Sequence, residues 1–379
     1  MNLCAWLAQM RTNLEYSASA KSLLFTNVSL LLIAAGGALG QSKLASSTPV
    51  STGGRVDYLP SINRLAYDKT SADGLFDTYT MAPNGTGKVC LTCGYPAIAQ
   101  SHNGNPAWHP SGQYILFQVH DASLPVLPVE WVPITYRVTN PGYGTNNNLW
   151  LMSADGSQYW QLTHVEAGNG LLHASFDKTG TKVVWAEKIG YTGPDQQWVI
   201  KVADFVWTDG VPELANQIVI APFGSDTFYE TYGFSPDGKY ILFAGGSPSQ
   251  ITLNLFLYSV QTGNVKNLTN SGTGIWNEHA HFTPDGKRII FGSSRDITLT
   301  REYYVPFTDY WMMNLNGTNP VRLTYFNDPA YPEFFSFGLV AADFTFTGSA
   351  AAVFAGLQQN QPIGDHNVYY IISVLKFAF

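Results

Sequence analysis

Short apolar runs and polar turns alternate along the chain, and the same alternation returns several times. Residues 232–246 read YGFSPDGKYILFAGG, and residues 280–294 read AHFTPDGKRIIFGSS. Each segment predicts a hairpin of two strands, because Asp-Gly fits a tight turn and Tyr, Ile and Phe favour pleated, half-buried surfaces. More divergent copies begin at residues 57, 106, 174 and 342, which makes six copies.

Most of these hairpins are followed by a second hairpin that ends in Leu-Thr. The second hairpins are predicted at residues 78–92, 149–163, 255–269 and 310–324. Two hairpins make one four-stranded blade, and a single blade cannot bury both of its faces alone. The sequence therefore predicts an all-β fold, a six-bladed β-propeller of four-stranded antiparallel blades, over residues 55–379.

The sixth copy is short of one strand. After residues 342–356 the chain has only NVYYIISVLKFAF, which is enough for one strand or a little more. We expect the missing strand to come from the N-terminal segment 41–54, near Ser47–Ser51, so that both ends of the propeller sequence close the ring.

Composition agrees with many short strands and narrows the range of partners. The chain has Gly 35, Pro 21 and 14% aromatic residues, which suit strands joined by tight turns. Only 12% of its residues are charged, and its formal net charge is −7. A nucleic acid partner is disfavoured, because Lys and Arg form no basic run or stripe. The low charge is compatible with neutral or sugar-like ligands.

Residues 1–40 are predicted to be a signal peptide. An apolar stretch at 23–39 follows Lys21, and Ala38 and Gly40 stand where small residues precede a cleavage site. An uncleaved membrane anchor is the alternative, since the stretch approaches the length that spans a bilayer. After cleavage we expect an exported protein, periplasmic or secreted to the extracellular space, with no membrane partner.

Cleavage would remove Cys4 and leave the C-x-x-C pair of Cys90 and Cys93. We expect these two residues to form a local disulfide that closes a turn, as exported proteins commonly do. The alternative of a thioredoxin-like redox site lacks the surrounding βαβ pattern. A C-x-x-C pair alone cannot supply the four ligands of a structural zinc site.

The repeated SPDG hairpin and the following W-M-x-x-D-G-x-x-x-x-x-L-T pattern resemble the repeats of TolB-like propellers. They also resemble the propeller domains of prolyl-oligopeptidase-type peptidases. The resemblance covers residues 55–379, with intact SPDG at 235–238 and TPDG at 283–286. It implies a non-catalytic binding scaffold that recognises a protein or a glycan through its loop-rich face. The sequence contains no G-x-S-x-G, H-E-x-x-H or Gly-rich phosphate motif.

Two long connections, at 119–147 and 294–309, supply the first candidate ligand-binding residues. Long loops on a rigid scaffold often carry binding. The candidates in these loops are aromatic or cationic: Trp131, Tyr136, Arg137, Arg295, Arg301 and Tyr303. The alternative is that each loop is a structural flap packed by its own aromatic residues and prolines.

The inner strands supply a second group of candidates. Aligning the copies on the turn glycine gives two positions near the start of each inner strand, close to the central channel. The first position holds Arg55, Gly104, Leu172, Glu230, Glu278 and Val340; the second holds Val56, Asn105, His173, Thr231, His279 and Ala341. The His and Glu residues of three consecutive blades are predicted to gather near one mouth of the channel. His102 and Asn105 are further ligand-binding candidates.

His173, Glu230, Glu278 and His279 could together hold one divalent metal ion, Ca, Mn or Zn, with a position left for water or substrate. The alternative function is therefore a metal-dependent carbohydrate-active enzyme, a polysaccharide lyase or hydrolase. Oligogalacturonate lyases, which the chain resembles at the level of the fold, hold a metal partly through His in such a channel. No lyase motif is matched, and the four side chains could instead only hydrogen-bond across a wet channel.

Overall fold

A computed structural model of the chain describes residues 42–96, 98, 101–126, 138–190, 196–297, 306–359 and 369–379. The contacts divide the chain into the units Met1–Leu32 and Ile33–Phe379, and every strand given below belongs to the second unit. The predicted signal peptide, 1–40, lies outside the described residues. Within the described part, no helix is both long and apolar enough to cross a membrane.

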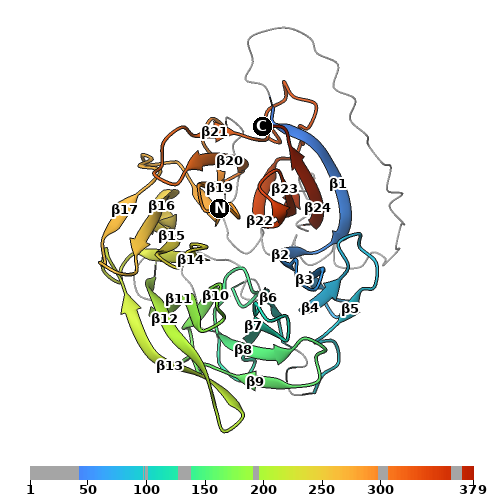
Figure 1. Cartoon of the computed structure of the whole chain (residues 1–379), viewed down its shortest axis with the longest axis vertical. Coiled ribbons are helices and arrows are strands. Elements are labelled where there is room, and N and C mark those ends of the chain that lie inside the picture. The colour runs from blue at the N-terminus through green and yellow to red at the C-terminus, as the bar shows by residue number, and fades with distance from the viewer. Residues whose placement is uncertain are drawn as a thin grey trace, which may run out of the picture. The chain divides into compact units, whose positions relative to one another are not determined.

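Six sheets of four antiparallel strands surround a central axis (Figure 1), which confirms the predicted fold class. The first three blades, from the inner strand outward, are β2 (Gly54–Leu59), β3 (Arg64–Thr70), β4 (Phe76–Met81) and β5 (Val89–Cys90); β6 (Asn103–Trp108), β7 (Tyr114–His120), β8 (Asn147–Ser153) and β9 (Tyr159–Gln161); and β10 (Gly170–Phe176), β11 (Lys182–Gly190), β12 (Gln197–Thr208) and β13 (Val211–Ile220).

The remaining blades follow the same order from the inner strand outward. They are β14 (Phe228–Phe234), β15 (Tyr240–Ser247), β16 (Thr252–Ser259) and β17 (Val265–Asn267); β18 (Asn277–Phe282), β19 (Arg288–Ser293), β20 (Asp309–Asn314) and β21 (Val321–Arg322); and β22 (Leu339–Ser349), β23 (Ala352–Gln359), β24 (Tyr369–Phe377) and β1 (Leu44–Thr52). A short 3-10 helix, η2 (Pro248–Gln250), connects β15 and β16.

The sixth blade joins both ends of the propeller sequence. β1 pairs antiparallel with β24, and Ser47 lies opposite Leu375. This pairing is the arrangement that the ring-closing hypothesis describes for the segment near Ser47–Ser51. Because the outer strand of the last blade comes from the beginning of the propeller, the first and last blades cannot separate without breaking a sheet.

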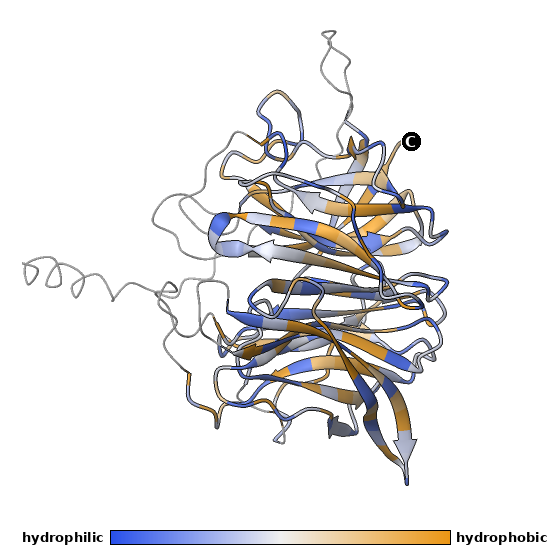
Figure 2. Ribbon diagram, turned by 90° about the vertical axis from the view of Figure 1, so that its left-hand side faces the viewer, coloured by the Kyte–Doolittle hydropathy of each residue, from blue (hydrophilic) through white to orange (hydrophobic). Residues whose placement is uncertain are grey.

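Apolar side chains fill the space between neighbouring blades. Leu242 and Leu255 of the fourth blade pack with Phe291 and Trp311 of the fifth blade in one buried cluster. Figure 2 shows apolar residues spread along the strands, in alternation with polar ones. Each blade therefore buries its apolar surface against the next blade, and the polar side chains of the inner strands are held in a rigid frame.

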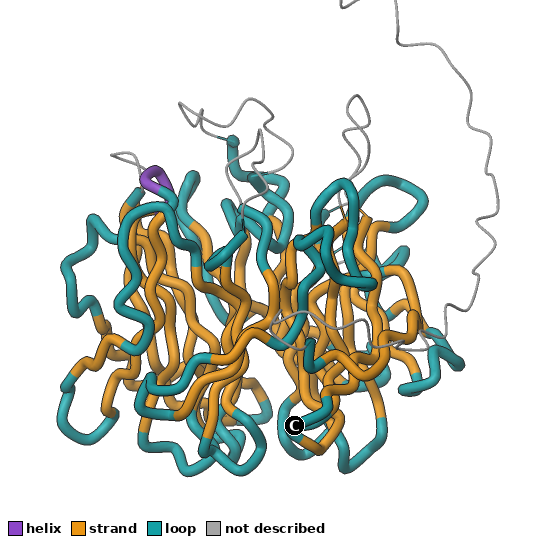
Figure 3. The backbone as a smooth tube through the Cα atoms, turned by 90° about the horizontal axis from the view of Figure 1, so that it is seen from above, coloured by secondary structure: helices purple, strands orange, loops and turns teal. Residues whose placement is uncertain are grey.

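The beginnings of the inner strands mark one face of the propeller. Gly170, at the start of β10, pairs with Lys188, near the end of β11, so the connections from second to third strands leave from this same face. The turns between first and second strands lie on the opposite face, because the strands are antiparallel, and Figure 3 shows loops at both ends of the strands. Of the predicted loop residues, Trp131, Tyr136, Arg137, Arg301 and Tyr303 lie outside the described residues.

Candidate functional site

β-bulges re-aim residues at the start of the inner strands. The strand register shifts near the channel entrance in all six blades. Four side-chain-bearing residues at these bulges have a left-handed backbone: Arg55 (φ 24°), Asn105 (φ 54°), His173 (φ 50°) and His279 (φ 48°). A bulge leaves one residue out of the ladder and turns its side chain, and bulges are frequent next to ligand sites.

Three of the predicted metal ligands come together in the channel. His173 of β10, Glu230 of β14 and His279 of β18 each offer one ligand atom, and these three atoms lie within 4.8 Å of one another. The contact between His173 Nε2 and Glu230 Oε1 measures 2.9 Å. Glu278, the fourth predicted ligand, approaches His279 Nε2 at 3.5 Å but does not belong to this group.

Sequence analysis missed the carboxylate that joins the two imidazoles. Asp343 of β22 accepts a hydrogen bond from His279 Nδ1 at 2.9 Å and lies 3.6 Å from His173 Nδ1. Tyr232 also joins the cluster, because its hydroxyl donates to Glu230 Oε2 at 2.7 Å. We call His173, Glu230, Tyr232, Glu278, His279 and Asp343 the channel cluster.

The charges of the channel cluster depend on one another. Burial favours neutral imidazoles, but the Asp343 and Glu278 carboxylates outweigh it and raise the pKa of His279 to about 10. Burial likewise opposes ionisation of Asp343, yet the two imidazolium groups hold its pKa well below the usual range. Burial raises the pKa of Glu278 against the opposing effect of His279. These shifts favour the charged forms of His279 and Asp343, whereas burial favours the neutral form of Glu278.

A buried ion pair and two aromatic rings fill the channel wall next to the first blade. Arg55 Nε contacts Asp68 Oδ2 at 2.5 Å, and both side chains are buried. The guanidinium lies over the rings of Phe76 and Tyr370, at 5.0 and 5.7 Å from their centroids. Gly142, in the connection before β8, is so close to the guanidinium that a Cβ there would stand 2.9 Å from Arg55 Nη1. This wall is packed, and we assign it no ligand.

The other sequence candidates lie apart from the channel cluster. Asn105 donates from Nδ2 to Gln118 Oε1 at 2.5 Å. His102 Nδ1 accepts from the backbone N–H of Phe76, and burial lowers the pKa of His102 to about 4. Arg295 lies over the ring of Trp311, 5.4 Å from its centroid. None of these three forms a hydrogen bond or ring contact with His173 or His279 in the described part of the chain.

Cys90 and Cys93 form a disulfide at the outer edge of the first blade, with their Cα atoms 5.6 Å apart. Cys90 ends β5, and Cys93 lies in the turn that follows. The bridge therefore fixes the end of the outermost strand and does not contribute to the channel.

Two comparisons based on sequence found nothing: no family model matches the chain, and no curated protein is significantly similar to it. Solved structures do resemble it. TolB from Acinetobacter baumannii is 13% identical, with a TM-score of 0.49, over 88% of this chain and 65% of that one. The chain thus spans slightly less than two thirds of that protein.

Two enzymes are similar to the same degree. An oligogalacturonate lyase in complex with manganese is 11% identical, with a TM-score of 0.48, over 90% of this chain and 95% of that one. A puromycin-hydrolyzing peptidase from Mycobacterium tuberculosis is 10% identical, with a TM-score of 0.47, over 86% of this chain and 53% of that one. Function has to be argued from this chain's own residues. The strand order of its blades gives the chain the six-bladed β-propeller fold that its repeats predict.

Proposed function

We propose that the chain is an exported binding scaffold that recognises a protein or a glycan at its loop-rich face, with the channel cluster as the floor of the binding site. Backbone strain at His173 and His279 carries this proposal. Both residues have a left-handed φ, which costs a residue with a Cβ about 1–2 kcal/mol. Strain of this kind concentrates at ligand sites, where the surrounding structure holds it in place.

The cluster is suited to a polar group of a ligand. The side chains of His173, Glu230, His279 and Asp343 are between 8% and 14% exposed, so they are largely desolvated but still reachable. Imidazolium groups donate hydrogen bonds and carboxylates accept them, which matches the hydroxyl and carboxyl groups of a saccharide or of a polar protein segment. A purely structural role would favour a fully buried arrangement of fixed charges.

Binding to an array of neutral and acidic oligosaccharides tests this proposal. We expect the wild-type chain to bind a subset of them, and the His173→Ala/His279→Ala variant to bind at least about tenfold more weakly. An Asn105→Ala variant is the matched control, because Asn105 occupies the same bulge position outside the cluster. Undiminished binding by the double variant would place the ligand elsewhere. A wild-type chain that binds no saccharide would remove the glycan half of the proposal.

The group formed by His173, Glu230 and His279 favours a second candidate, a metal-dependent carbohydrate-active enzyme. Two imidazoles and one carboxylate fit Zn or Mn better than Ca, which prefers oxygen ligands. A bound ion would polarise an oxygen of the ligand or of water. The chain's own part would be to hold the ion with residues from three blades, and to fix the two imidazoles through Asp343.

Elemental analysis of protein purified without chelator decides for or against this candidate. We expect one equivalent of metal in the wild-type chain and none in the His173→Ala/His279→Ala variant. That result would direct a search for lyase or hydrolase activity on polysaccharides. No metal in either protein would eliminate the enzyme candidate and leave the binding scaffold.

A further inference from the structure

The same corner motif occurs once in each of four blades. In each, the threonine that follows the fourth strand hydrogen-bonds a polar side chain at the start of the third strand. Each threonine Oγ1 donates to the facing side chain and accepts a backbone N–H from the following residue of the third strand. The pairs are Thr92 with Asp77 (2.6 Å), Thr163 with Asn148 (3.2 Å), Thr269 with Asn254 (2.9 Å) and Thr324 with Asp309 (2.9 Å). Because the corner repeats, equivalent positions can be compared between blades.

The corner of the fifth blade neutralises its buried acid. Asp309 is fully buried, and Arg322 Nη2 approaches Asp309 Oδ2 at 2.8 Å. Arg322 stands two residues before Thr324. In the second and fourth blades the acid is replaced by Asn148 and Asn254, which need no cation. In these three corners no carboxylate is buried without a positive partner, as the cost of burying a lone charge requires.

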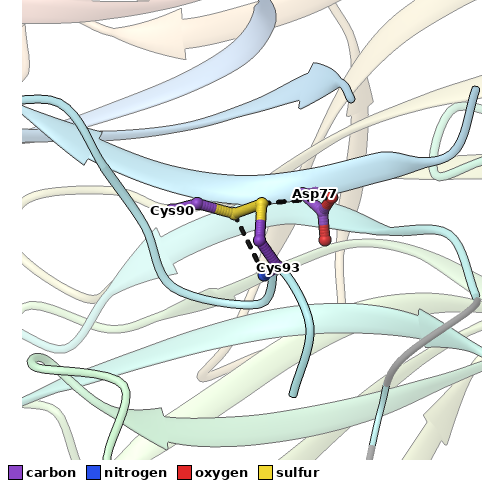
Figure 4. A group of neighbouring side chains, drawn as sticks. All are labelled: Asp77, Cys90 and Cys93. Carbon is purple, nitrogen blue, oxygen red and sulfur yellow. Dashed lines mark hydrogen bonds between the residues drawn. A yellow bond between two sulfur atoms is a disulfide. The ribbon is translucent and has the colours of Figure 1, made fainter. Parts of the chain in front are cut away.

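The corner of the first blade departs from this rule. Asp77 is only 7% exposed, yet no Lys, Arg or His nitrogen lies within 4.0 Å of it among the described residues. The position two residues before Thr92, where the fifth blade has Arg322, is occupied by Cys90. Cys93 Sγ lies 3.4 Å from Asp77 Oδ2 (Figure 4). That sulfur belongs to the disulfide and has no proton to donate, so within the described residues Asp77 has neither an ion-pair partner nor a donor at Cys93 Sγ.

We propose that Asp77, Cys90 and Cys93 form a redox-gated site for a thiophilic divalent metal such as Zn²⁺, closed in the disulfide form and opened by reduction. One ligand atom from each residue already lies within 4.8 Å of the others. The N–H of Cys93 points at Cys90 Sγ at 3.0 Å, so it would stabilise a thiolate there. A divalent ion gives Asp77 the positive partner that Arg322 gives Asp309, and water completes the tetrahedron.

The chemistry balances with a dithiol reductant. The reductant supplies two electrons and two protons, its own sulfurs form a disulfide, and the Cys90–Cys93 bond becomes two thiols. Metal binding then releases the two thiol protons as the thiolates coordinate the ion, while Asp77 contributes a carboxylate oxygen. A small-molecule disulfide can reverse the sequence: it takes up two electrons and two protons to become two thiols, the Cys90–Cys93 bond re-forms, and the ion loses its thiolate ligands and leaves.

Cobalt binding before and after reduction tests the site. The full chain carries Cys4→Ser, so that Cys90 and Cys93 are the only cysteines. Cobalt is added to oxidised protein and to protein reduced with a phosphine that is then removed. We expect thiolate-to-cobalt absorption only in the reduced sample, at one equivalent. Zinc should displace the cobalt. Any binding at the channel cluster is common to both samples and gives no thiolate band, so this test stands apart from the proposed function.

Asp77→Asn is the informative variant, because the second and fourth blades fold with Asn at this position. We expect it to melt like the wild type and to bind cobalt at least about tenfold more weakly after reduction. Cys90→Ser should abolish the thiolate band. A reduced chain without the band would overturn the proposal, and equal affinity in Asp77→Asn would remove the carboxylate from the site.

Discussion

Two buried carboxylates in this propeller, Asp309 and Asp343, are neutralised in opposite ways. Asp309 is held at the outer corner of the fifth blade by Arg322, whose charge is permanent at any ordinary pH. Asp309 Oδ1 also accepts hydrogen bonds from Thr324 Oγ1 and from the backbone N–H of Phe326. Each partner sits on regular strand or turn backbone, so this corner carries charge without strain.

The partners of Asp343 in the channel are histidines, which carry a charge only when they are protonated. Burial lowers the pKa of His279 and His173, and the carboxylates of Asp343 and its acidic neighbours raise both above the ordinary value. Both histidines have left-handed backbones, and the cluster keeps some exposure to water. A buried charge alone therefore does not mark a functional site. Strain, partial access and interdependent charges together distinguish the channel from the corner.

The largest expected effect is at the corner. Arg322→Ala leaves Asp309 buried without its cation, and we expect the free energy of unfolding to fall by about 3–5 kcal/mol. Urea denaturation followed by tryptophan fluorescence measures the loss. Replacing both residues, as Asp309→Asn/Arg322→Gln, recreates the Asn148 and Gln161 arrangement of the second blade and should recover most of it. If the single variant lost less than about 1 kcal/mol, the corner would not be the structural ion pair described here.

The propeller and four of the six residues of the channel cluster were predicted from the sequence, because the turn glycine gives a common reference position for aligning the copies. Counting back from it reached His173 and His279 correctly. It failed where the number of residues between the turn and the bulge differs. Arg55, not the expected Val56, takes the bulge position of the first blade, and in the fourth blade the register shifts only after Thr231, at Tyr232.

Asp343 was missed for the same physical reason. β22 has two register shifts, between Ala341 and Phe344 and between Phe346 and Ser349, so counting from its turn displaces every channel position. The only signal available was an acid inside the ADF segment of an otherwise apolar strand. The corner at Asp77 was not predicted for a different reason. The Leu-Thr pairs marked where each blade ends, and the residues beside them were not compared from blade to blade.

A second test concerns Lys188, which is buried like Arg322 but forms no ion pair with an acid among the described residues. It is 2% exposed, and its ammonium donates to Thr145 Oγ1 at 2.7 Å. Burial lowers the pKa of Lys188 to about 8, below the value of the unfolded chain. The unfolded state then binds more protons, so this residue's contribution to stability should rise as the pH increases from about 8 to about 10.5.

The gain from Lys188 should be on the order of 3 kcal/mol across that interval. Other groups also titrate there, so the measurement is the difference in unfolding free energy between the wild type and Lys188→Met. We expect the methionine variant to be the more stable protein near neutral pH, and its advantage to shrink toward alkaline pH. A difference that stays constant with pH would mean that Lys188 is charged and solvated in the folded chain, unlike the buried cation described here.

The smallest effect isolates the strain that sets the channel apart from the corner. His279→Ala and His279→Gly remove the same imidazole, but only glycine adopts a φ of 48° without steric cost. We expect the glycine variant to be more stable than the alanine variant by about 1 kcal/mol in urea denaturation. Its neighbour Ala280 provides the control, because it is buried in the same strand and has no positive φ. Ala280→Gly should destabilise the chain. If glycine were the less stable choice at both positions, His279 would carry no backbone strain, and the channel would differ from the corner only in the nature of its charges.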